Sequence, residues 1–232
     1  MAAQIELTLD FLDGDVTTTR TVVVKKAVVG GWTGRDKAAL QHHIGELAKI
    51  GITPPEQLPT FYRVGVTRIV TADAVEVIGD ASSGEAEYVM LKTGGRIWVG
   101  AGSDHTDRAF ERFGITLAKQ LCDKPIAKTF WPLAEVEDHW DELRLRAFVH
   151  GGGERVLYQD GGVAGLLSPG ELLSHYGEGD RELEEGTLMF GGTCGAIGGV
   201  RYAPRFEFEL EDPVRGRKIS HAYDVLPVPI RG

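Results

Sequence analysis

The chain has 232 residues, 42% of them hydrophobic and 25% charged, which is typical of a globular protein that folds in water. A net charge of −9 without any run of lysines or arginines argues against nucleic acid and membranes as partners. No apolar run is long enough to cross a bilayer, the first residues lack a signal-peptide pattern, and the two cysteines, Cys122 and Cys194, lack metal-site or disulfide spacing. We therefore expect a cytoplasmic protein.

The first third of the chain predicts strands followed by one helix. Residues 5–9 and 21–29 are rich in β-branched and apolar residues, as strands are. Residues 35–50 carry apolar side chains at helical spacing, and a glycine and two prolines follow. Thr33 or Asp36 can cap the start of this helix.

Three carboxylates flank the clearest hairpin of the sequence. Residues 88–99 predict two strands joined by a Gly-Gly turn. Because alternate residues of a strand share a face, Glu85 and Glu87 point the same way, and the returning strand brings Asp104 back beside them. Three hard oxygen ligands suit a divalent ion such as Mg²⁺, Mn²⁺ or Ca²⁺. Spacing alone leaves a solvated strand face open as the alternative.

The rest of the chain predicts one further helix and then mainly strands. Residues 106–121 are expected to be helical, and the chain after Trp131 is expected to consist mainly of strands and turns. Residues 205–210 alternate polar and apolar side chains, and residues 218–225 can pair with them as a hairpin. Without a repeat or a long linker, we expect a single β-rich α+β domain covering residues 1–232. One face of the second helix is expected to carry Phe110, Phe113, Leu117 and Leu121.

The first predicted helix also carries a histidine and a glutamate three residues apart. His43 and Glu46 are therefore neighbours on the helix surface, bordering its apolar stripe. A glutamate beside a histidine can hold its tautomer and raise its basicity, so that it takes a proton from water. The alternative is an exposed pair that adds a few tenths of a kcal/mol to the helix.

Several short segments occur in the order of the motifs of one family. His43 and Glu46 match a His-x-x-Glu helix, residues 58–63 match Pro-x-x-Phe-x-Lys, and Glu85 and Glu87 match Glu-x-Glu. Asp104 to Arg108 then match an Asp-x-x-x-Arg motif, and Lys119 matches a lysine that follows it in the family. Residues 152–159 match an Asn-Gly-Glu…Gln strand, and residues 186–193 match a closing Gly-Thr loop. Taken together, residues 30–225 resemble the fumarylacetoacetate hydrolase superfamily, in a compact bacterial branch without an assigned function.

This resemblance implies a fold, a reaction and a set of site residues. The fold would be fumarylacetoacetase-like, a mixed β-roll or barrel with a few flanking helices, and the protein would commonly be a homodimer. The enzyme would be a hydrolase that cleaves a carbon–carbon bond in a small β-dicarbonyl acid of the acylpyruvate type, through a metal-bound enolate. Mg²⁺ or Mn²⁺ is expected, with Ca²⁺ also compatible. The implied residues are Glu85, Glu87 and Asp104 for the metal, His43, Glu46 and Lys119 for catalysis, and Arg63, Arg108, Gly192 and Thr193 for substrate.

Three features of the sequence depart from the family pattern and keep other functions open. Arg63 replaces a lysine, Leu40 and Gln41 replace an Asn-Tyr pair that contacts substrate, and a bare hairpin replaces a longer connection between Glu87 and Asp104. The same metal site could instead serve a decarboxylase or an isomerase. A non-catalytic protein that binds small molecules with the same fold is the alternative outside the enzymes.

Overall fold

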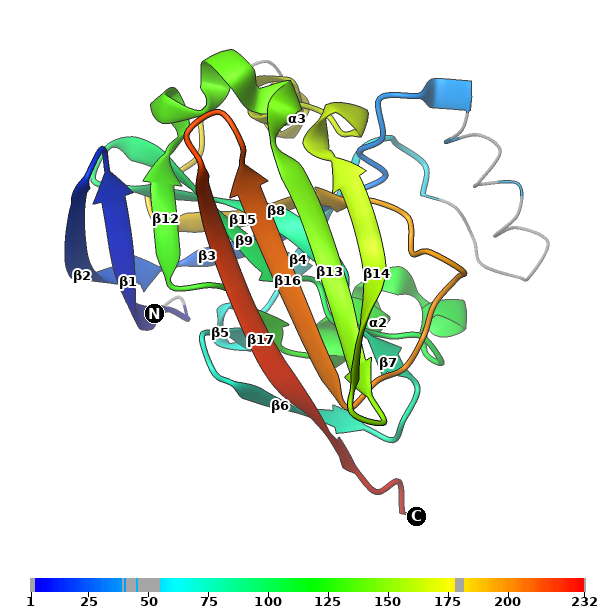
Figure 1. The fold of residues 1–232 in the computed structure, drawn as a ribbon. Helices are drawn as coiled ribbons and strands as arrows, with labels where there is room; N and C mark the ends of the chain where they lie inside the picture. The colour runs from blue at the N-terminus through cyan, green and yellow to red at the C-terminus, as the bar shows by residue number, and fades with distance from the viewer. Residues whose placement is uncertain (1–2, 39, 41–44, 46–54, 178–181, 232) are drawn as a thin grey trace.

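The computed structural model describes the whole chain except residues 1–2, 39, 41–44, 46–54, 178–181 and 232. Two large β-sheets pack against each other (Figure 1), one with the strand order β2-β1-β12-β9-β8-β15-β3-β4 and the other with the order β14-β13-β16-β17-β6. The eight strands of the first sheet are β1 (Ile5–Asp13), β2 (Val16–Val24), β3 (Lys26–Gly31), β4 (Thr60–Val64), β8 (Ala86–Thr93), β9 (Arg96–Ser103), β12 (Thr129–Pro132) and β15 (Thr187–Thr193).

The second sheet and two short strand pairs complete the β-structure. Its five strands are β6 (Ala74–Ile78), β13 (Arg144–Gly151), β14 (Glu154–Gly162), β16 (Arg205–Asp212) and β17 (Arg217–Val228). The short pairs are β5 (Ile69–Val70) with β11 (Lys124–Pro125), and β7 (Ser82–Ser83) with β10 (Thr106–Asp107). The predicted β-rich α+β class is therefore confirmed, whereas the predicted number of domains stays a prediction.

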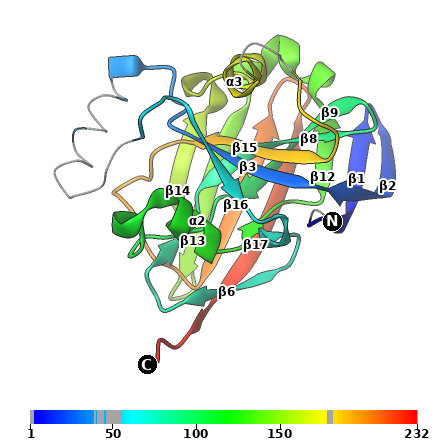
Figure 2. The same cartoon turned by 180° about the vertical axis from the view of Figure 1, so that it is seen from behind.

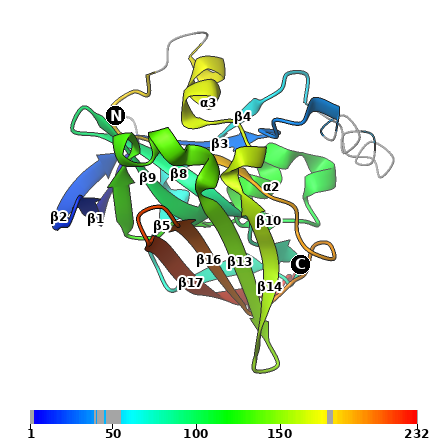
Figure 3. The same cartoon turned by 45° about the horizontal axis from the view of Figure 1, so that its top comes forward.

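The described helices are few and short. α2 (Ile115–Leu121) lies beside β4 (Figure 2), and α3 (Pro169–Tyr176) lies next to β3 (Figure 3). Leu172 of α3 packs against Gly30 of β3. No helix within the described ranges is long and apolar enough to span a membrane. The 3-10 turns are η1 (Val66–Arg68), η2 (Glu111–Phe113), η3 (Leu133–Glu135), η4 (Glu137–Glu142) and η5 (Val163–Gly165).

The central strand β8 is buried on both faces, and this divides the core in two. Tyr88 and Met90 belong to the cluster between the two sheets, whereas Val89 and Leu91 belong to the cluster on the other face of the larger sheet. Because side chains alternate along a strand, Glu87 shares the face of Val89 and Leu91. The face of the larger sheet that turns away from the smaller sheet is thus the one that carries the carboxylates.

The strand predictions agree with the structure, with one break. Residues 5–9 lie within β1, and residues 205–210 and 218–225 lie within the hairpin of β16 and β17. The segment 21–29 was predicted as one strand but divides at Lys25 into the end of β2 and the start of β3. The predicted helix 35–50 falls mostly outside the described residues. At its start, Asp36 acts as the cap, since its Oδ1 accepts a hydrogen bond from the Ala38 amide at 2.9 Å.

The prediction for the second helix and the prediction for the region after Trp131 need correction. Residues 106–121 do not form one helix, because Gly114 has a φ of 148°, which interrupts the chain between η2 and α2. The predicted apolar face is lost as well, since Phe113 is 64% exposed. In the region expected to consist mainly of strands and turns, α3 is a helix. Its signal was present in the sequence: Ser168 and Glu171 form a capping box around a proline at the first turn.

Candidate metal centre

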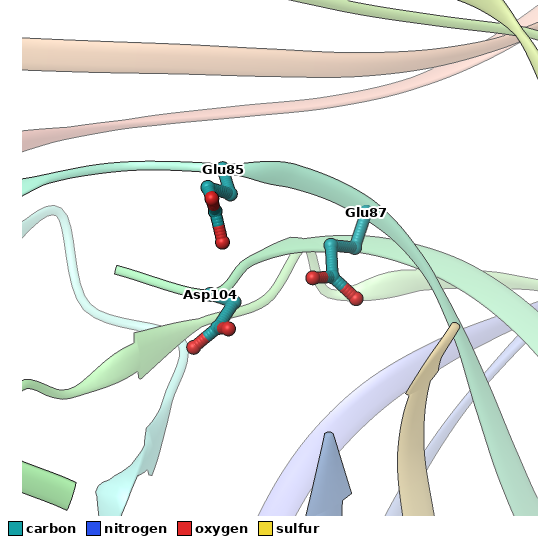
Figure 4. Close-up of side chains that lie close together, drawn as sticks. All are labelled: Glu85, Glu87 and Asp104. Carbon is teal, nitrogen blue, oxygen red and sulfur yellow. The ribbon is translucent and has the colours of Figure 1, made fainter. Parts of the chain in front are cut away.

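Three carboxylates meet where the hairpin of β8 and β9 ends. The register pairs Glu87 with Gly102, and just beyond the last pair the Asp104 amide donates to the Glu85 carbonyl oxygen at 3.0 Å. The carboxylates of Glu85, Glu87 and Asp104 face one another (Figure 4). One oxygen atom from each carboxylate lies within 4.8 Å of one oxygen atom from each of the other two. Glu87 and Asp104 are almost completely buried. The predicted convergence of the three side chains is therefore present in the structure.

Two lysines meet the Asp104 carboxylate. Lys119, on α2, forms a short ion pair with Oδ2 of Asp104, and its Nζ lies 3.9 Å from Glu85 Oε2. Lys124, on β11, places its Nζ 3.4 Å from Oδ1 of Asp104. Both lysines are buried. The role predicted for Lys119 next to the carboxylates thus has a geometric basis, whereas Lys124 was not predicted.

Arg108 is held by three side chains of the protein. Its Nη2 lies 3.0 Å from Glu85 Oε1, its Nη1 donates to Glu111 Oε1 at 2.8 Å, and its Nε donates to Ser83 Oγ at 2.7 Å. Such a guanidinium, fixed on three sides, orients the Glu85 carboxylate. The substrate contact predicted for Arg108 stays a prediction.

The Gly-Thr segment at the end of β15 is attached to β8. The Gly192 amide donates to Glu87 Oε2 at 2.7 Å, and Thr193 Oγ1 donates to the Ala86 carbonyl oxygen at 2.8 Å. Buried Gln159 joins the two segments, because its Oε1 accepts from the Ala86 amide and its Nε2 donates to Thr193 Oγ1. In this structure the two groups predicted to bind substrate thus hold the segment that carries Glu87.

The structure does not bring Arg63 to the carboxylates. Arg63 is exposed on β4 and lies near Glu184. The pKa of Glu184 is lowered chiefly by its hydrogen bond with Lys26, and the charge of Arg63 makes a smaller contribution. Its neighbour Tyr62 points the other way, as alternation along a strand requires. The Lys119 Nζ lies 5.6 Å from the centre of the Tyr62 ring, and the Tyr62 hydroxyl accepts from Trp32 Nε1 at 3.0 Å.

Burial and crowding of like charges act most strongly on Glu87. Removal from water and the neighbouring Asp104 charge raise the pKa of Glu87 well above its usual range. Burial also opposes ionisation of Asp104, but the charges of Lys119 and Lys124 outweigh it and lower the pKa of Asp104. Among the described residues, Glu87 is therefore a buried carboxylate that forms no ion pair with a cationic side chain, although the charge of Lys119 partly offsets the rise of its pKa. A divalent ion bound by the three carboxylates would supply that missing charge, so the site fits Mg²⁺ or Mn²⁺.

A neutral network lies on the opposite side of the same strand end. His105 Nδ1 shares a hydrogen bond of 2.8 Å with the Tyr223 hydroxyl, and its Nε2 shares one of 2.9 Å with Ser82 Oγ. The Tyr223 hydroxyl also lies 2.8 Å from Ser103 Oγ, which accepts from the Glu85 amide at 3.3 Å. Burial, supported by the charge of Lys124, lowers the pKa of His105 to about 3, so its imidazole is neutral at pH 7.

The structure therefore unites most of the predicted site. It joins the three carboxylates to Lys119, Arg108 and the Gly-Thr segment, and it leaves Arg63 outside. His43 and Glu46 lie outside the described residues. Tyr62 was missed although the alternation of residues 61–64 places it opposite Arg63, and Lys124 was missed because nothing near it in the sequence marks a buried lysine.

The fold of the chain matches proteins of known structure. A candidate fumarylpyruvate hydrolase from Burkholderia cenocepacia is 18% identical, with a TM-score of 0.64 over 91% of this chain and 89% of that one. A yeast protein, ynq8, of the fumarylacetoacetate hydrolase family is 19% identical (TM-score 0.62; 90% and 97% covered). A 5-carboxymethyl-2-hydroxymuconate delta-isomerase from Mycobacterium smegmatis is 15% identical (TM-score 0.62; 93% and 88% covered).

These similarities define the class of the protein by its fold. The chain has the fold of the fumarylacetoacetate hydrolase superfamily, as its motifs suggested. Within that class, residues 30–223 match the family model described as "Protein of unknown function (DUF2848)", and the chain belongs to this family. No curated protein matches the chain.

Proposed function

We propose that this protein is a divalent-metal-dependent hydrolase that cleaves a carbon–carbon bond in a small β-dicarbonyl acid of the acylpyruvate type. The observation that carries the proposal is the group formed by Glu85, Glu87 and Asp104 with the Lys119 ammonium beside it. The fold adds support, because a candidate fumarylpyruvate hydrolase and other members of the hydrolase superfamily share it.

The three carboxylates supply the hard oxygen ligands that Mg²⁺ and Mn²⁺ prefer. Bound there, the ion would act as a Lewis acid toward the two oxygens of a β-dicarbonyl substrate. Arg108 and the Gly192 amide hold the carboxylates of Glu85 and Glu87 in place, so the ligands are oriented before substrate arrives. This preorganisation supports a site for chemistry rather than an incidental acidic surface.

The remaining groups divide the hydrolysis between them. His43, oriented by Glu46, would take a proton from water, whose oxygen then adds to the distal carbonyl carbon. When the carbon–carbon bond breaks, its electron pair moves to the departing fragment as an enolate, which takes up a proton to give pyruvate. The Lys119 ammonium, buried beside Asp104, would stabilise the negative charge of that fragment.

Incubation of the protein with Mn²⁺ and a panel of acylpyruvates tests the proposal. We expect pyruvate to be released, and we expect Glu87→Gln to abolish both its release and the heat of Mn²⁺ binding in a calorimetric titration. Glu76→Gln, which alters an exposed glutamate on β6, is the matched control and should change neither. A wild-type protein that binds neither Mn²⁺ nor Mg²⁺ would contradict the proposal and favour a metal-free binding protein.

His43 separates the hydrolase from the other reactions of such a site. A hydrolase needs an activated water, so His43→Ala should remove activity while leaving Mn²⁺ binding intact. A decarboxylase or isomerase would form the same enolate without attack by water. Activity that survives His43→Ala but not Glu85→Ala would therefore replace hydrolysis with one of these two reactions.

A further inference from the structure

Lys124 is a fully buried lysine beside Asp104. Its ammonium donates to the carbonyl oxygens of His105 at 2.6 Å and Cys122 at 2.9 Å, and through a shorter bond to that of Lys119. Its exposed fraction is zero. Three carbonyl acceptors require three N–H donors, which a lysine has only in its protonated form. The position therefore holds a positive charge inside the protein.

The three carbonyl groups belong to the segments that carry the site. His105 directly follows Asp104, Lys119 contacts the Asp104 carboxylate, and Cys122 caps the helix on which Lys119 lies. The same Nζ lies 3.4 Å from Oδ1 of Asp104. One ammonium thus joins the backbone after β9 to the end of α2 and also faces the carboxylate between them.

We infer that Lys124 is a positioning residue, an internal cation that fixes Asp104 and Lys119 relative to each other so that Asp104 is oriented for metal binding. The inference rests on the proposed metal site for its functional consequence. Its structural part, a niche of carbonyl oxygens and one carboxylate that requires a cation, does not depend on any bound metal. A buried cation is costly unless its environment compensates it, and here four oxygen atoms do so.

Chemical rescue can separate the charge of Lys124 from its volume. Lys124→Ala removes three carbons and the ammonium, a gap that n-propylammonium matches in shape and charge and that 1-propanol matches in shape alone. Because partners that orient a metal ligand typically contribute about 10- to 100-fold in affinity, the Mn²⁺ dissociation constant should rise by that factor in the variant. Addition of n-propylammonium should restore it, whereas 1-propanol should not. Lys128→Ala, at an exposed lysine nearby, is the control and should bind Mn²⁺ as the wild type does.

A second readout tests the niche without metal. In metal-free protein, n-propylammonium should raise the melting temperature of Lys124→Ala but not that of Lys128→Ala. Equal rescue by 1-propanol, or wild-type Mn²⁺ affinity in a folded Lys124→Ala, would overturn the inference. If the wild type binds no metal, the proposed function fails, and the thermal rescue alone decides whether Lys124 is an internal cation.

A folding defect in Lys124→Ala does not remove the test. Lys124→Met keeps most of the side-chain volume and loses the charge, and it should show the same loss of Mn²⁺ affinity. If neither variant folds, wild-type protein labelled with ¹⁵N-lysine provides the measurement. A Lys124 ammonium held by three carbonyls should exchange slowly with water and give an NMR signal that shifts when Mg²⁺ is added. The absence of such a signal would overturn the inference.

Discussion

Where the hairpin of β8 and β9 ends, the two faces of the larger sheet differ in how their polar groups find partners. On one face, Glu85, Glu87 and Asp104 crowd together, and Glu87 has no cationic side chain as its partner within the described residues. On the other face, His105 and Tyr223 join serine hydroxyls in a network that carries no charge at pH 7. Successive residues alternate between these faces, so that Ser103 and His105 belong to the network and Asp104 to the carboxylates.

The difference indicates how the protein supports a charged site. The neutral network satisfies its own hydrogen bonds and reaches the Glu85 amide through Ser103, so it stabilises the strand end without adding charge. On the carboxylate face, Glu87 forms no ion pair with a described cationic side chain, and a bound cation could balance its charge. Support and the proposed metal binding therefore lie on opposite faces of the same backbone, and each can be altered separately.

Replacement of Asp104 should have the largest effect. Asp104→Asn removes the only anionic partner of Lys124 among the described residues, and it leaves Lys119 only the longer contact with Glu85 at 3.9 Å. Loss of one member of a buried ion pair typically costs about 3–5 kcal/mol. We expect a loss of that size in urea denaturation, together with loss of Mn²⁺ binding. Asp160→Asn removes the partner of Arg144 in an exposed ion pair and should cost no more than about 1 kcal/mol. Similar losses in the two variants would mean that the carboxylate face carries no special charge balance.

Lowering the pH should destabilise the folded protein, because the neutral network holds His105 in its unprotonated form. The pKa of His105 is about 3 in the folded protein and about 6.5 when unfolded, so as pH falls the unfolded chain takes up the proton first. The stability that His105 contributes is therefore present above pH 6.5 and is lost as pH falls toward 3. This loss amounts to about 3 kcal/mol between pH 7 and pH 4. Burial is its main cause; Lys124 and Arg108 add to it, and Asp104 opposes it.

The measurement compares denaturation curves of the wild type and His105→Gln at several pH values. His105→Gln removes the titrating imidazole, so the difference in stability between the two proteins should shrink as pH falls from 7 to 4. A difference that stays constant over this range would show that folding leaves the pKa of His105 at its ordinary value, and the evidence for a network that resists charge would be lost.

The sequence predicted the carboxylate face better than the network. Glu85, Glu87 and Asp104 could be placed together because a hairpin with a two-residue turn has a fixed register and alternates its side chains. His105 could not be assigned a partner, because Tyr223 lies 118 residues further along the chain in the other sheet. Contacts between sheets depend on how the sheets pack, and local patterns do not specify that.

The prediction of one helix over residues 106–121 failed for a related reason. The segment 106–121 has helical spacing of its large side chains, but Gly114 and the pairing of β10 with β7 override that pattern. The consequence for the site is direct: only the short α2 remains helical, and Lys119 on it reaches Asp104. The burial of Lys124 was not predicted because three of its hydrogen-bond partners are backbone carbonyls. Every residue has such a carbonyl, so the sequence does not mark these partners.

The Gly192 position should tolerate no side chain. Gly192 has a φ of 111°, and a Cβ there would lie 1.9 Å from Thr33 Oγ1. Gly192→Ala should therefore destabilise the protein by about 1–3 kcal/mol from backbone strain alone. It should also weaken Mn²⁺ binding, because the amide that holds Glu87 must move. Gly195→Ala in the same segment has open space around its Cβ and should behave as the wild type. Unchanged Mn²⁺ affinity in Gly192→Ala would show that this amide does not position Glu87.

Removal of one hydroxyl from the neutral face should have the smallest effect and should define how independent the two faces are. Tyr223→Phe removes the oxygen that joins His105 to Ser103 and leaves both side chains buried with one partner fewer. A buried group that loses its partner costs about 1–3 kcal/mol, so the midpoint of urea denaturation should fall accordingly. Tyr202→Phe, at a tyrosine that is 56% exposed, is the control and should leave stability unchanged.

Metal affinity is the informative quantity in Tyr223→Phe. The carboxylates keep Lys119, Arg108 and the Gly192 amide, all of which contact them from their own face, so Mn²⁺ should bind nearly as well as in the wild type. A fall in affinity as large as that of Gly192→Ala would mean that the Ser103 link to the Glu85 amide transmits strain through the backbone. In that case the neutral face would also determine ligand geometry, and the network would belong to the metal site itself.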